Sequence, residues 1–417
     1  MSAPLAYSRP NSGSVDPSLR KWESNAPAGD ESTSQARPTL HVPDGFVELT
    51  LARPATLPVL ALGAELKSSV CLYAGRSAFI HDRLGNLTDP VSYRQYAKAI
   101  DRLLSTTGIR PRILAHDLHP LYISSQYAQG STVKRVAVQH HHAHVAAVAA
   151  DCGVSGPVVG VCCDGVGMGT DGAAWGCEVL LCDGGRFRRF GHLDYFHLIG
   201  GDAAAVENWR PAAALLYQAF GNNWRAHLPA SFSELSGESL SVADRTFSRK
   251  LDTHWTSSLG RVFDGVSFLL GLSQRNDASS VAAVALERAA AADAVAPYPY
   301  ETTMIGGCVR MSMTSITRAV MRDIQAGATV GIVSARFHET IARMLAASAT
   351  LACAFGRCSR VVLAGGCFAN KFLKSRVTER LSAQRLQVLT PLRVSLGDEN
   401  IALGQAVVAA AMENEVQ

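Results

Sequence analysis

The order of apolar and polar positions predicts strands alternating with helices over most of the chain. An apolar run from Val59, a polar turn at Gly63 and a second apolar run through Cys71 predict a β-hairpin. The same plan returns at Val158, where an apolar strand precedes a turn rich in glycine and aspartate and a second strand over 179–182. Two such hairpins, separated by about a hundred residues, predict two related lobes.

Helices are predicted between and after these hairpins, because apolar residues there recur every three to four positions. We expect them at residues 92–104, 141–151, 203–220, 281–292, 330–352 and 371–381. A buried strand over 360–364 ends at two glycines, and a last helix follows Asp398. Strands alternating with helices are typical of an α/β protein.

The first part of the chain lacks this periodicity. Residues 1–38 are rich in Ser, Pro, Asn, Gly and charged residues, which predicts a disordered tail. We expect residues 39–58 to be a linker, 59–156 the first lobe and 157–417 the second, with the final helix packing back on the first lobe. No apolar run has the form of a secretory signal or of a membrane span.

Composition adds two expectations. The formal charge is only +4 and no block of Lys and Arg stands out, so nothing indicates a nucleic-acid groove. The ten cysteines form no CxxC pair. Because several lie in apolar runs, we expect reduced core thiols and a cytoplasmic protein without a membrane anchor.

Four histidines fall within five positions in the stretch VQHHHAHVAAVAA. If the helix begins at His140, His140 and His144 lie four apart on one face, a spacing at which two imidazoles can bind one metal ion. The alternative is a polar helix start with solvated imidazoles. The apolar residues that follow favour a buried helix, whose imidazoles need partners. No Glu follows the first histidine, which excludes the zinc-protease motif.

Glycine-rich segments are candidates for anion or nucleotide binding. After Asp164, at the end of a predicted strand, come Gly165, Gly167 and Gly169, whose backbone N–H groups can approach an anion. The alternative is an ordinary glycine-rich hairpin. A carboxylate at that strand end needs a metal, a base or several donors.

Three further positions precede helices. Gly200, Gly201 and Asp202 form either a phosphate site or a simple N-cap. Gly365 and Gly366 end a strand, where they accommodate a flat ring or only tight packing. Asp398 is a metal-ligand candidate or a helix cap.

The order of these motifs resembles the carbamoyltransferase module of the HypF family of hydrogenase maturation proteins. The matching stretches run from about Val59 to the C-terminus and read LALGAELKSSVCL, AHDLHPLYISSQYA, VQHHHAHVAAV, DGVGMGTDGAAWGCE, IGGDAAAVENWRPAAALL, LAGGCFANKFL and GDENIALGQ. The resemblance implies two ribonuclease-H-like lobes of the actin and sugar-kinase type around a nucleotide and metal cleft.

The resemblance also implies the site residues. The divalent metal, iron or zinc, is held by His140, His144, Asp164 and Asp398. Residues implied to contact the nucleotide are Gly165, Gly167, Gly169, Gly200, Gly201, Asp202, Gly365, Gly366 and Asn370. Lys67 is implied as a catalytic, phosphate-facing cation. His141 and His142 are then expected behind the ligands or at the surface.

The implied reaction carries a carbamoyl group from ATP-derived carbamoyl-adenylate to the C-terminal cysteine of a HypE-like partner, releasing AMP. The thiocarbamate is the precursor of the cyanide ligand of the nickel–iron centre. The acylphosphatase-like, zinc-finger and YrdC-like domains of full-length relatives are missing from this sequence. We therefore expect an adenylating domain to act in trans.

The sequence departs from the family at two places. Residues 278–281 read Ala-Ser-Ser-Val where the family carries Tyr-Glu-Gly-Gln, and Arg83 and Asn86 stand where it has His and Asp. Two alternatives stay open: a non-catalytic scaffold of the maturation complex, and an O-carbamoyltransferase acting on a small hydroxyl substrate.

Overall fold

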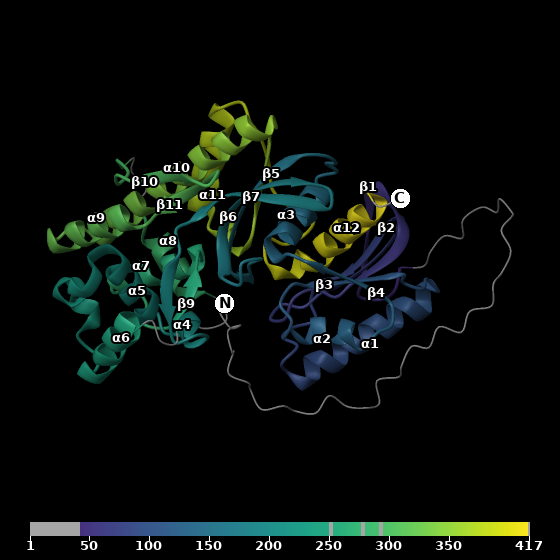
Figure 1. Cartoon of the computed structure of the whole chain (residues 1–417), viewed down its shortest axis with the longest axis horizontal. Helices are drawn as coiled ribbons and strands as arrows, with labels where there is room; N and C mark the ends of the chain where they lie inside the picture. The colour runs from purple at the N-terminus through teal and green to yellow at the C-terminus, as the bar shows by residue number, and fades with distance from the viewer. Residues whose placement is uncertain (1–41, 250–252, 277–279, 292–294, 416–417) are drawn as a thin grey trace, which may run out of the picture.

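The computed structural model describes residues 42–249, 253–276, 280–291 and 295–415. The tail expected at residues 1–38 lies outside these residues, as do positions 278 and 279 of the altered segment. The described chain forms two lobes, each built on its own β-sheet. Figure 1 shows the lobes side by side, with helices α3 (His140–Asp151) and α12 (Ile401–Asn414) between them.

The first lobe holds a four-stranded sheet in the order β2-β1-β3-β4. Its strands are β1 (Val47–Ala61), β2 (Val70–His81), β3 (Ile113–Asp117) and β4 (Lys134–Val138). β1 and β2 pair antiparallel, β3 runs parallel to β1, and β4 runs parallel to β3. Helices α1 (Pro90–Thr107) and α2 (Ile123–Gln129) cover one face of this sheet, where their apolar side chains join one core cluster.

Part of the linker expected at 39–58 is strand instead, because β1 begins at Val47. Its first residues alternate between exposed and buried side chains, the pattern of a strand with one face on the core. Pro54 and Pro58 made this stretch resemble a linker, since proline donates no ladder hydrogen bond. The structure places both near irregularities in the β1–β2 register, where regular pairing is already interrupted.

The second lobe holds a larger, mixed sheet. Its main strands are β5 (Val158–Met168), β6 (Ala174–Asp183), β7 (Arg186–Leu193), β10 (Glu301–Ile305), β11 (Cys308–Ser312), β12 (Arg360–Ala364) and β13 (Gln387–Leu389). They lie in the order β10-β11-β7-β6-β5-β12-β13. A short ribbon of β8 (Phe196–Ile199) and β9 (Thr253–Thr256) joins the sheet where β9 pairs with β6.

Helices surround this second sheet. They are α4 (Ala203–Val206), α5 (Trp209–Phe220), α6 (Gly237–Arg249), α7 (Leu259–Leu269), α8 (Val281–Ala289), α9 (Thr314–Gln325), α10 (Val330–Gly356) and α11 (Lys371–Ala383). Apolar residues of most of these helices and of the sheet form the largest core cluster of the described chain. The 3-10 turns η3 (Gly366–Ala369) and η4 (Asp398–Asn400) precede α11 and α12.

The predicted duplication is present in the sheets. In the first lobe the antiparallel pair β2-β1 continues into parallel β3 and β4, and in the second the antiparallel pair β6-β5 continues into parallel β12 and β13. Each lobe thus consists of a hairpin extended by two parallel strands. The carboxyl ends of β3, β4 and β12 approach the irregular part of β5 around Asp164 at the boundary between the lobes, as the contacts described below show.

Helices α3 and α12 join the two lobes. α12 packs on α3 and on β1, β2 and β3, and the apolar residues of these elements form one core cluster. α3 also packs on β5 and β12 of the second lobe. The two helices touch closely at Gly404, because a Cβ atom there would lie 1.8 Å from the carbonyl oxygen of Ala143.

The predicted helices occur near their expected positions, with one change. The helix expected at 203–220 is two helices, α4 and α5, with a break at Glu207 and Asn208. Glu207 forms an isolated β-bridge with Arg275, which diverts the backbone from the helix. Pro211 then lies in the first turn of α5, where its missing N–H is tolerated.

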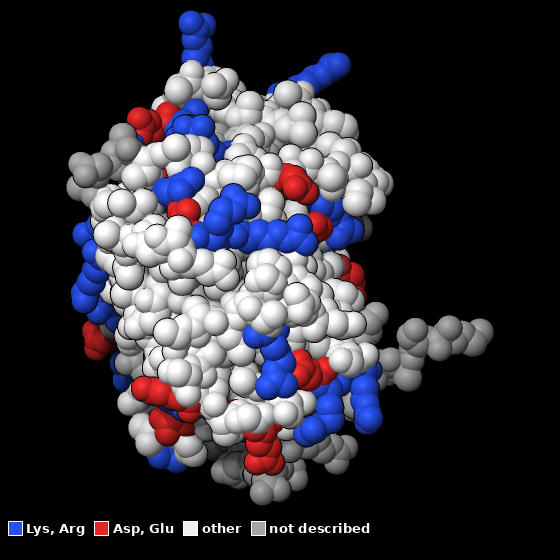
Figure 2. All heavy atoms as spheres, turned by 90° about the vertical axis from the view of Figure 1, so that its left-hand side faces the viewer, with Lys and Arg blue, Asp and Glu red and all other residues white. Residues whose placement is uncertain are grey.

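The surface and the thiols follow the composition. Figure 2 shows Lys and Arg mixed with Asp and Glu on the face that carries α9 and α6. Each of the ten cysteines is a free thiol. Within the described residues, no helix combines the length and the apolar character that a membrane span requires.

Candidate metal centre

Helix α3 brings its first histidine directly to the lobe boundary. β4 ends at Val138, and Gln139 caps the helix by accepting a hydrogen bond from the N–H of His142, 2.9 Å away. Since the helix starts at His140, His140 and His144 lie one turn apart on the same face, with ring centroids separated by 4.9 Å. The spacing in the sequence therefore produces the expected pair of imidazoles.

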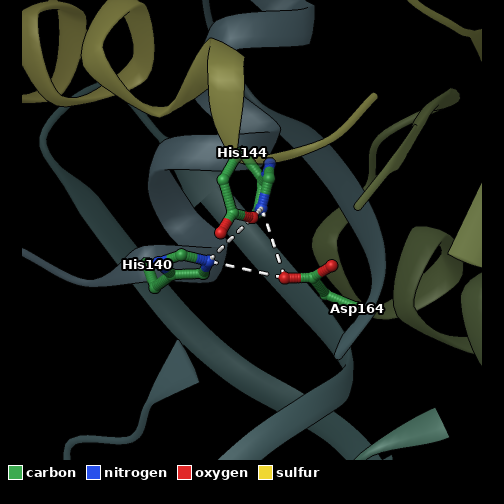
Figure 3. Close-up of side chains that lie close together, drawn as sticks. His140, His144 and Asp164 are labelled. Atoms are coloured by element: carbon green, nitrogen blue, oxygen red, sulfur yellow. Dashed lines mark ion pairs between the residues drawn. The ribbon is translucent and has the colours of Figure 1, made fainter. Parts of the chain in front are cut away.

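Four predicted ligands converge at this point. His140 and His144 meet Asp164, which lies within β5 where its pairing with β6 is irregular rather than at the expected strand end, and Asp398 from the start of η4. The Nε2 atom of His140 lies 3.4 Å from Asp164 and 3.6 Å from Asp398, and that of His144 lies 3.5 Å from each. One potential ligand atom from each residue lies within 4.8 Å of all the others. Figure 3 shows three of these side chains pointing toward one another.

Hydrogen bonds on the far side of each ring decide which nitrogen faces the cluster. The Nδ1 atom of His140 lies 2.8 Å from a carboxylate oxygen of Asp117 at the end of β3. The Nδ1 atom of His144 lies 2.9 Å from the side-chain oxygen of Asn400. Because both partners are acceptors, each Nδ1 carries the proton and donates, which leaves each Nε2 lone pair facing the carboxylates. These contacts orient the ligands as in known metal sites.

The residues present fit a divalent cation. Among the described residues, neither Nε2 atom has a hydrogen-bond partner, although both histidines are buried. Orphaned buried polar atoms are rare unless an ion or water satisfies them. Ligand atoms about 2.1 Å from a shared tetrahedral ion lie about 3.4 Å from one another, close to the spacing of these nitrogen and oxygen atoms. Two imidazoles and two carboxylates suit several divalent metals.

The electrostatics of the cluster favour a positive charge. Burial lowers the pKa of His140 and His144, but the carboxylates around them outweigh burial and raise the pKa of both. Burial raises the pKa of Asp164 and Asp398, and the charge of Asp164 adds to this for Asp398, but the two histidine rings beside the carboxylates outweigh both effects and lower the pKa of Asp164 and of Asp398, the latter to about 2. Both carboxyl groups are therefore ionised at neutral pH, ready to balance a cation.

The glycine pair after β12 touches this cluster. Gly366 donates its N–H to a carboxylate oxygen of Asp164 at 3.1 Å. Gly365 has a φ of 91°, and a Cβ atom there would lie 2.3 Å from the carbonyl oxygen of Cys163. Close packing therefore explains Gly365, and Gly366 orients one ligand, while the nucleotide contact of both glycines stays a prediction. Asp398 makes no capping hydrogen bond for α12, whose N-cap is Asn400.

The glycines after Asp164 differ in what surrounds them. A Cβ atom on Gly167 would lie 2.7 Å from the ring of His140, and one on Gly169 would lie 2.1 Å from the indole of Trp175. Of the three predicted phosphate-binding glycines, Gly165 alone has open space where a Cβ atom would lie. Close packing thus explains two of the three glycines, and the phosphate role of all three stays a prediction.

The remaining predicted residues lie outside the four-ligand cluster. Gly200 and Gly201 both have positive φ, while the exposed Asp202 starts a helix of only four residues. The Nζ atom of Lys67 lies 3.6 Å from Glu399, the neighbour of Asp398, and its side chain is 55% exposed. Lys67 is thus beside the metal-ligand segment, although no described contact places it on a phosphate.

Asn370 has structural contacts that the sequence did not reveal. Its side-chain oxygen accepts from the N–H of Leu373 at 2.8 Å and caps α11. Its amide nitrogen donates to the buried ring of His338 at 2.9 Å. The first two N–H groups of α11, those of Lys371 and Phe372, donate to the carboxylate of Glu287. Nucleotide contact by Asn370 therefore stays a prediction beside a demonstrated capping role.

The two middle histidines, His141 and His142, are both buried, so the expectation that they lie at the surface is wrong. His141 accepts a hydrogen bond at Nδ1 from Gln139, 3.1 Å away. His142 packs on the opposite side against Phe187, with ring centroids 5.0 Å apart.

Sequence analysis missed Asp117 and Asn400, although both stand in the motifs AHDLHPLY and GDENIALGQ. A carboxylate at a strand end was the available signal for Asp117.

Comparisons with known proteins agree with this architecture. Two protein-family models match the chain: "HypF Kae1-like domain" over residues 54–151 and "Carbamoyltransferase, Kae1-like Domain, second subdomain" over 160–405. The fold resembles crystal structures of full-length HypF in a phosphate- and nucleotide-bound form (TM-score 0.83, 31% identity) and of T. kodakarensis HypF (TM-score 0.80, 25% identity). The chain covers 48% and 50% of those proteins, which in turn match 88% of it.

Curated relatives carry the same name. The chain is 38% identical over 365 residues to a carbamoyltransferase HypF homolog of Cupriavidus necator, covering 85% of this chain and 91% of that protein. It is 36% identical over 377 residues to carbamoyltransferase HypF2 of the same organism, of which it covers 46%. A Rhizobium leguminosarum HypF is 36% identical, with 47% of that protein covered. The chain thus spans about half the length of the longer relatives.

The fold and the site define an α/β protein of two lobes, each a β-hairpin extended by two parallel strands, with a four-residue cluster suited to a metal between them. More specifically, the chain belongs to the HypF carbamoyltransferase family.

Proposed function

We propose that this chain transfers a carbamoyl group from carbamoyl-adenylate to the C-terminal cysteine thiol of a HypE-like maturation protein. The family supports carbamoyl transfer. The observation that carries the proposal is the pair of buried, unpartnered Nε2 atoms facing two ionised carboxylates. A separate adenylating domain would supply the donor. Ten free thiols suit a reducing, cytoplasmic setting.

His140, His144, Asp164 and Asp398 would hold the divalent metal. When bound, the metal would act as a Lewis acid that polarises a phosphate or carbamoyl oxygen of the donor. Iron and zinc both suit this set of ligands.

The chain's own residues would fix the geometry of the reaction. Asp117 and Asn400 keep the proton of each imidazole on Nδ1, and the N–H of Gly366 holds the second oxygen of Asp164. The ammonium of Lys67 would offer positive charge to the departing phosphate from the first-lobe side of the cleft. In the transfer, a thiolate sulfur bonds to the carbamoyl carbon, the bond from that carbon to the phosphate oxygen breaks, and AMP leaves with the electron pair.

The nucleophile would come from the partner. Burial raises the pKa of Cys162, Cys163 and Cys367 well above that of an ordinary thiol. These thiols near Asp164 are therefore neutral at pH 7 and poor nucleophiles, because the thiolate is the reactive form. An accessible cysteine at the end of another chain meets this need without any rearrangement of the cleft.

The test combines the metallated chain, a HypE-like partner and carbamoyl-adenylate generated by an adenylating domain. Intact-protein mass spectrometry should show the mass gain of one carbamoyl group on the partner. The gain should disappear with His144→Ala in this chain and with Ser in place of the partner's terminal cysteine. No gain with fully metallated wild-type protein would reject the proposal.

A non-catalytic scaffold is the second candidate, motivated by residues 278–281. Ser280 adopts a left-handed φ of 58° at the position where the family has Gly. A left-handed φ is one that glycine adopts readily, while the carboxylate and the amide of the family are replaced by Ser279 and Val281. Titration with AMP separates the candidates, since partner binding without AMP binding would favour the scaffold. Carbamoylation of a small hydroxyl compound in the same assay, with the partner left unmodified, would favour an O-carbamoyltransferase.

A further inference from the structure

A hydrogen-bonded network closes the far end of the glycine turn, by which we mean residues 164–173, the irregularly paired last part of β5 and the loop that leads into β6. Its centre is Asp171, whose carboxylate accepts from four donors. These are the backbone N–H of Ala173 at 3.1 Å, the indole of Trp175 at 2.9 Å, the hydroxyl of Tyr195 at 2.5 Å and the guanidinium of Arg189 at 3.2 Å. One side chain of the turn is therefore fixed by groups from β6, from β7 and from the loop after β7.

The donors of this network are themselves held in place. Arg189 donates to the buried carboxylate of Glu178 at 2.6 Å and also to Tyr195 at 2.6 Å. Its guanidinium lies 3.8 Å from the ring centroid of Trp175. Ser257 donates to Glu178 at 2.5 Å. The network thus connects the turn to the interior of the second lobe, and only 14% of the Arg189 side chain is exposed.

Two further contacts fix the near end and the middle of the turn. The hydroxyl of Ser258 donates to the carbonyl of Gly165, and the amide of Gln139 donates to the carbonyl of Met168 at 3.1 Å. Between them Val166 remains 48% exposed. The turn is therefore anchored at three points, yet its outer side stays open to a ligand, with the metal cluster at its base.

We infer that Asp171, Arg189 and Tyr195 are positioning residues that hold the glycine turn in the one conformation whose backbone meets the anionic donor. The inference rests on the proposed function. A segment with so many glycines has many backbone conformations, and restricting them before binding removes an entropic cost from donor binding. None of the three residues belongs to the metal cluster, so their loss should weaken donor binding and leave metal binding intact.

The sharpest perturbation is Tyr195→Phe, which keeps the ring and removes one hydroxyl, and with it the hydrogen bonds to Asp171 and from Arg189. The chain offers a matched control in Tyr298, whose hydroxyl donates to Asp323 at 2.8 Å. Arg336 also donates to Asp323, at 2.6 Å, and lies 4.3 Å over the ring of Tyr298. The same tyrosine–aspartate–arginine arrangement thus recurs beside α9 and α10, away from the turn. Asp171→Asn serves as a second variant of the network.

The experiment measures amide hydrogen exchange of a peptide covering residues 165–173, the KM for carbamoyl-adenylate, kcat and bound metal. For Tyr195→Phe we expect faster exchange in this peptide and a KM raised about tenfold, the effect of one lost hydrogen bond to a charged acceptor. kcat and metal content should stay within about twofold of wild type. Tyr298→Phe should change none of these quantities, although its melting temperature should fall by about as much as that of Tyr195→Phe.

The outcomes separate this inference from the proposed function. If wild-type protein transfers no carbamoyl group, the proposed function fails, and AMP affinity replaces KM as the binding measurement. Faster exchange with weaker AMP binding in Tyr195→Phe and Asp171→Asn, but not in Tyr298→Phe, supports the inference. Exchange or donor binding equal to wild type in both network variants, or an equal loss in the control, overturns it.

Discussion

Replacing Asp117 by Asn should weaken metal binding although Asp117 is not a proposed ligand. Its carboxylate accepts a hydrogen bond from the Nδ1 of His140 at 2.8 Å, and neither side chain is more than 1% exposed. With a carboxylate there, the proton stays on Nδ1 and the lone pair stays on Nε2. An amide at this position is neutral and can turn its NH2 group toward the ring, which would place the imidazole proton on the metal side.

The magnitude follows from the kind of hydrogen bond that is lost. Changes to groups that orient metal-binding histidines typically lower metal affinity by about 10- to 100-fold, or about 1.4–2.8 kcal/mol. The bond from His144 to Asn400 has a neutral acceptor, and neutral hydrogen bonds contribute about half as much as charged ones. We therefore expect Asp117→Asn to reduce affinity more than Asn400→Leu.

The assay is competition with a chromophoric chelator, with zinc as the probe metal, at pH 7. Asp101→Asn is the control, because Asp101 lies exposed on α1 and is not one of the residues of the metal cluster. Circular dichroism establishes that each variant is folded. Equal zinc affinity of Asp117→Asn and the wild type would refute the orienting role of Asp117.

Three further changes have defined outcomes. Burial lowers the pKa of His338 to about 4. The stability that the neutral imidazole contributes is therefore complete above its unfolded-state pKa of about 6.5 and is lost as pH falls toward 4. Across this pH window, urea titrations should show that the free energy of unfolding of His338→Gln falls by up to about 3 kcal/mol less than that of the wild type. Gly404→Ala places a Cβ atom 1.8 Å from a carbonyl oxygen of α3 and should lower the free energy of unfolding by about 1–3 kcal/mol, whereas Gly237→Ala, with no atom within 4 Å, should not. Gly167→Ala should push the ring of His140 away and lower zinc affinity in the chelator assay, and unchanged affinity would show that the site adapts.

The features that sequence analysis predicted well are those that neighbouring residues determine. A four-residue spacing on one helix brings His140 and His144 together, and alternating apolar runs identify both hairpins. The order of motifs, through the family resemblance, then linked Asp164 and Asp398 to the same site, although these residues are far apart in the chain.

The features that were missed depend on contacts between distant segments. Asp117 orients a ring that is 23 positions away, and Asn400 one that is 256 positions away, so no local pattern indicates either bond. The strand before Val59 contains two prolines, and both lie where the β1–β2 register is irregular, a pairing that depends on the partner strand. The capping role of Asn370 depends on His338, which is placed by the packing of α10.

Bound-metal analysis of the purified chain tests the central claim most directly. The account predicts one divalent ion per chain in the wild type and little or none in folded His144→Ala and Asp398→Ala. The same metal content in all three proteins would contradict the proposed metal centre.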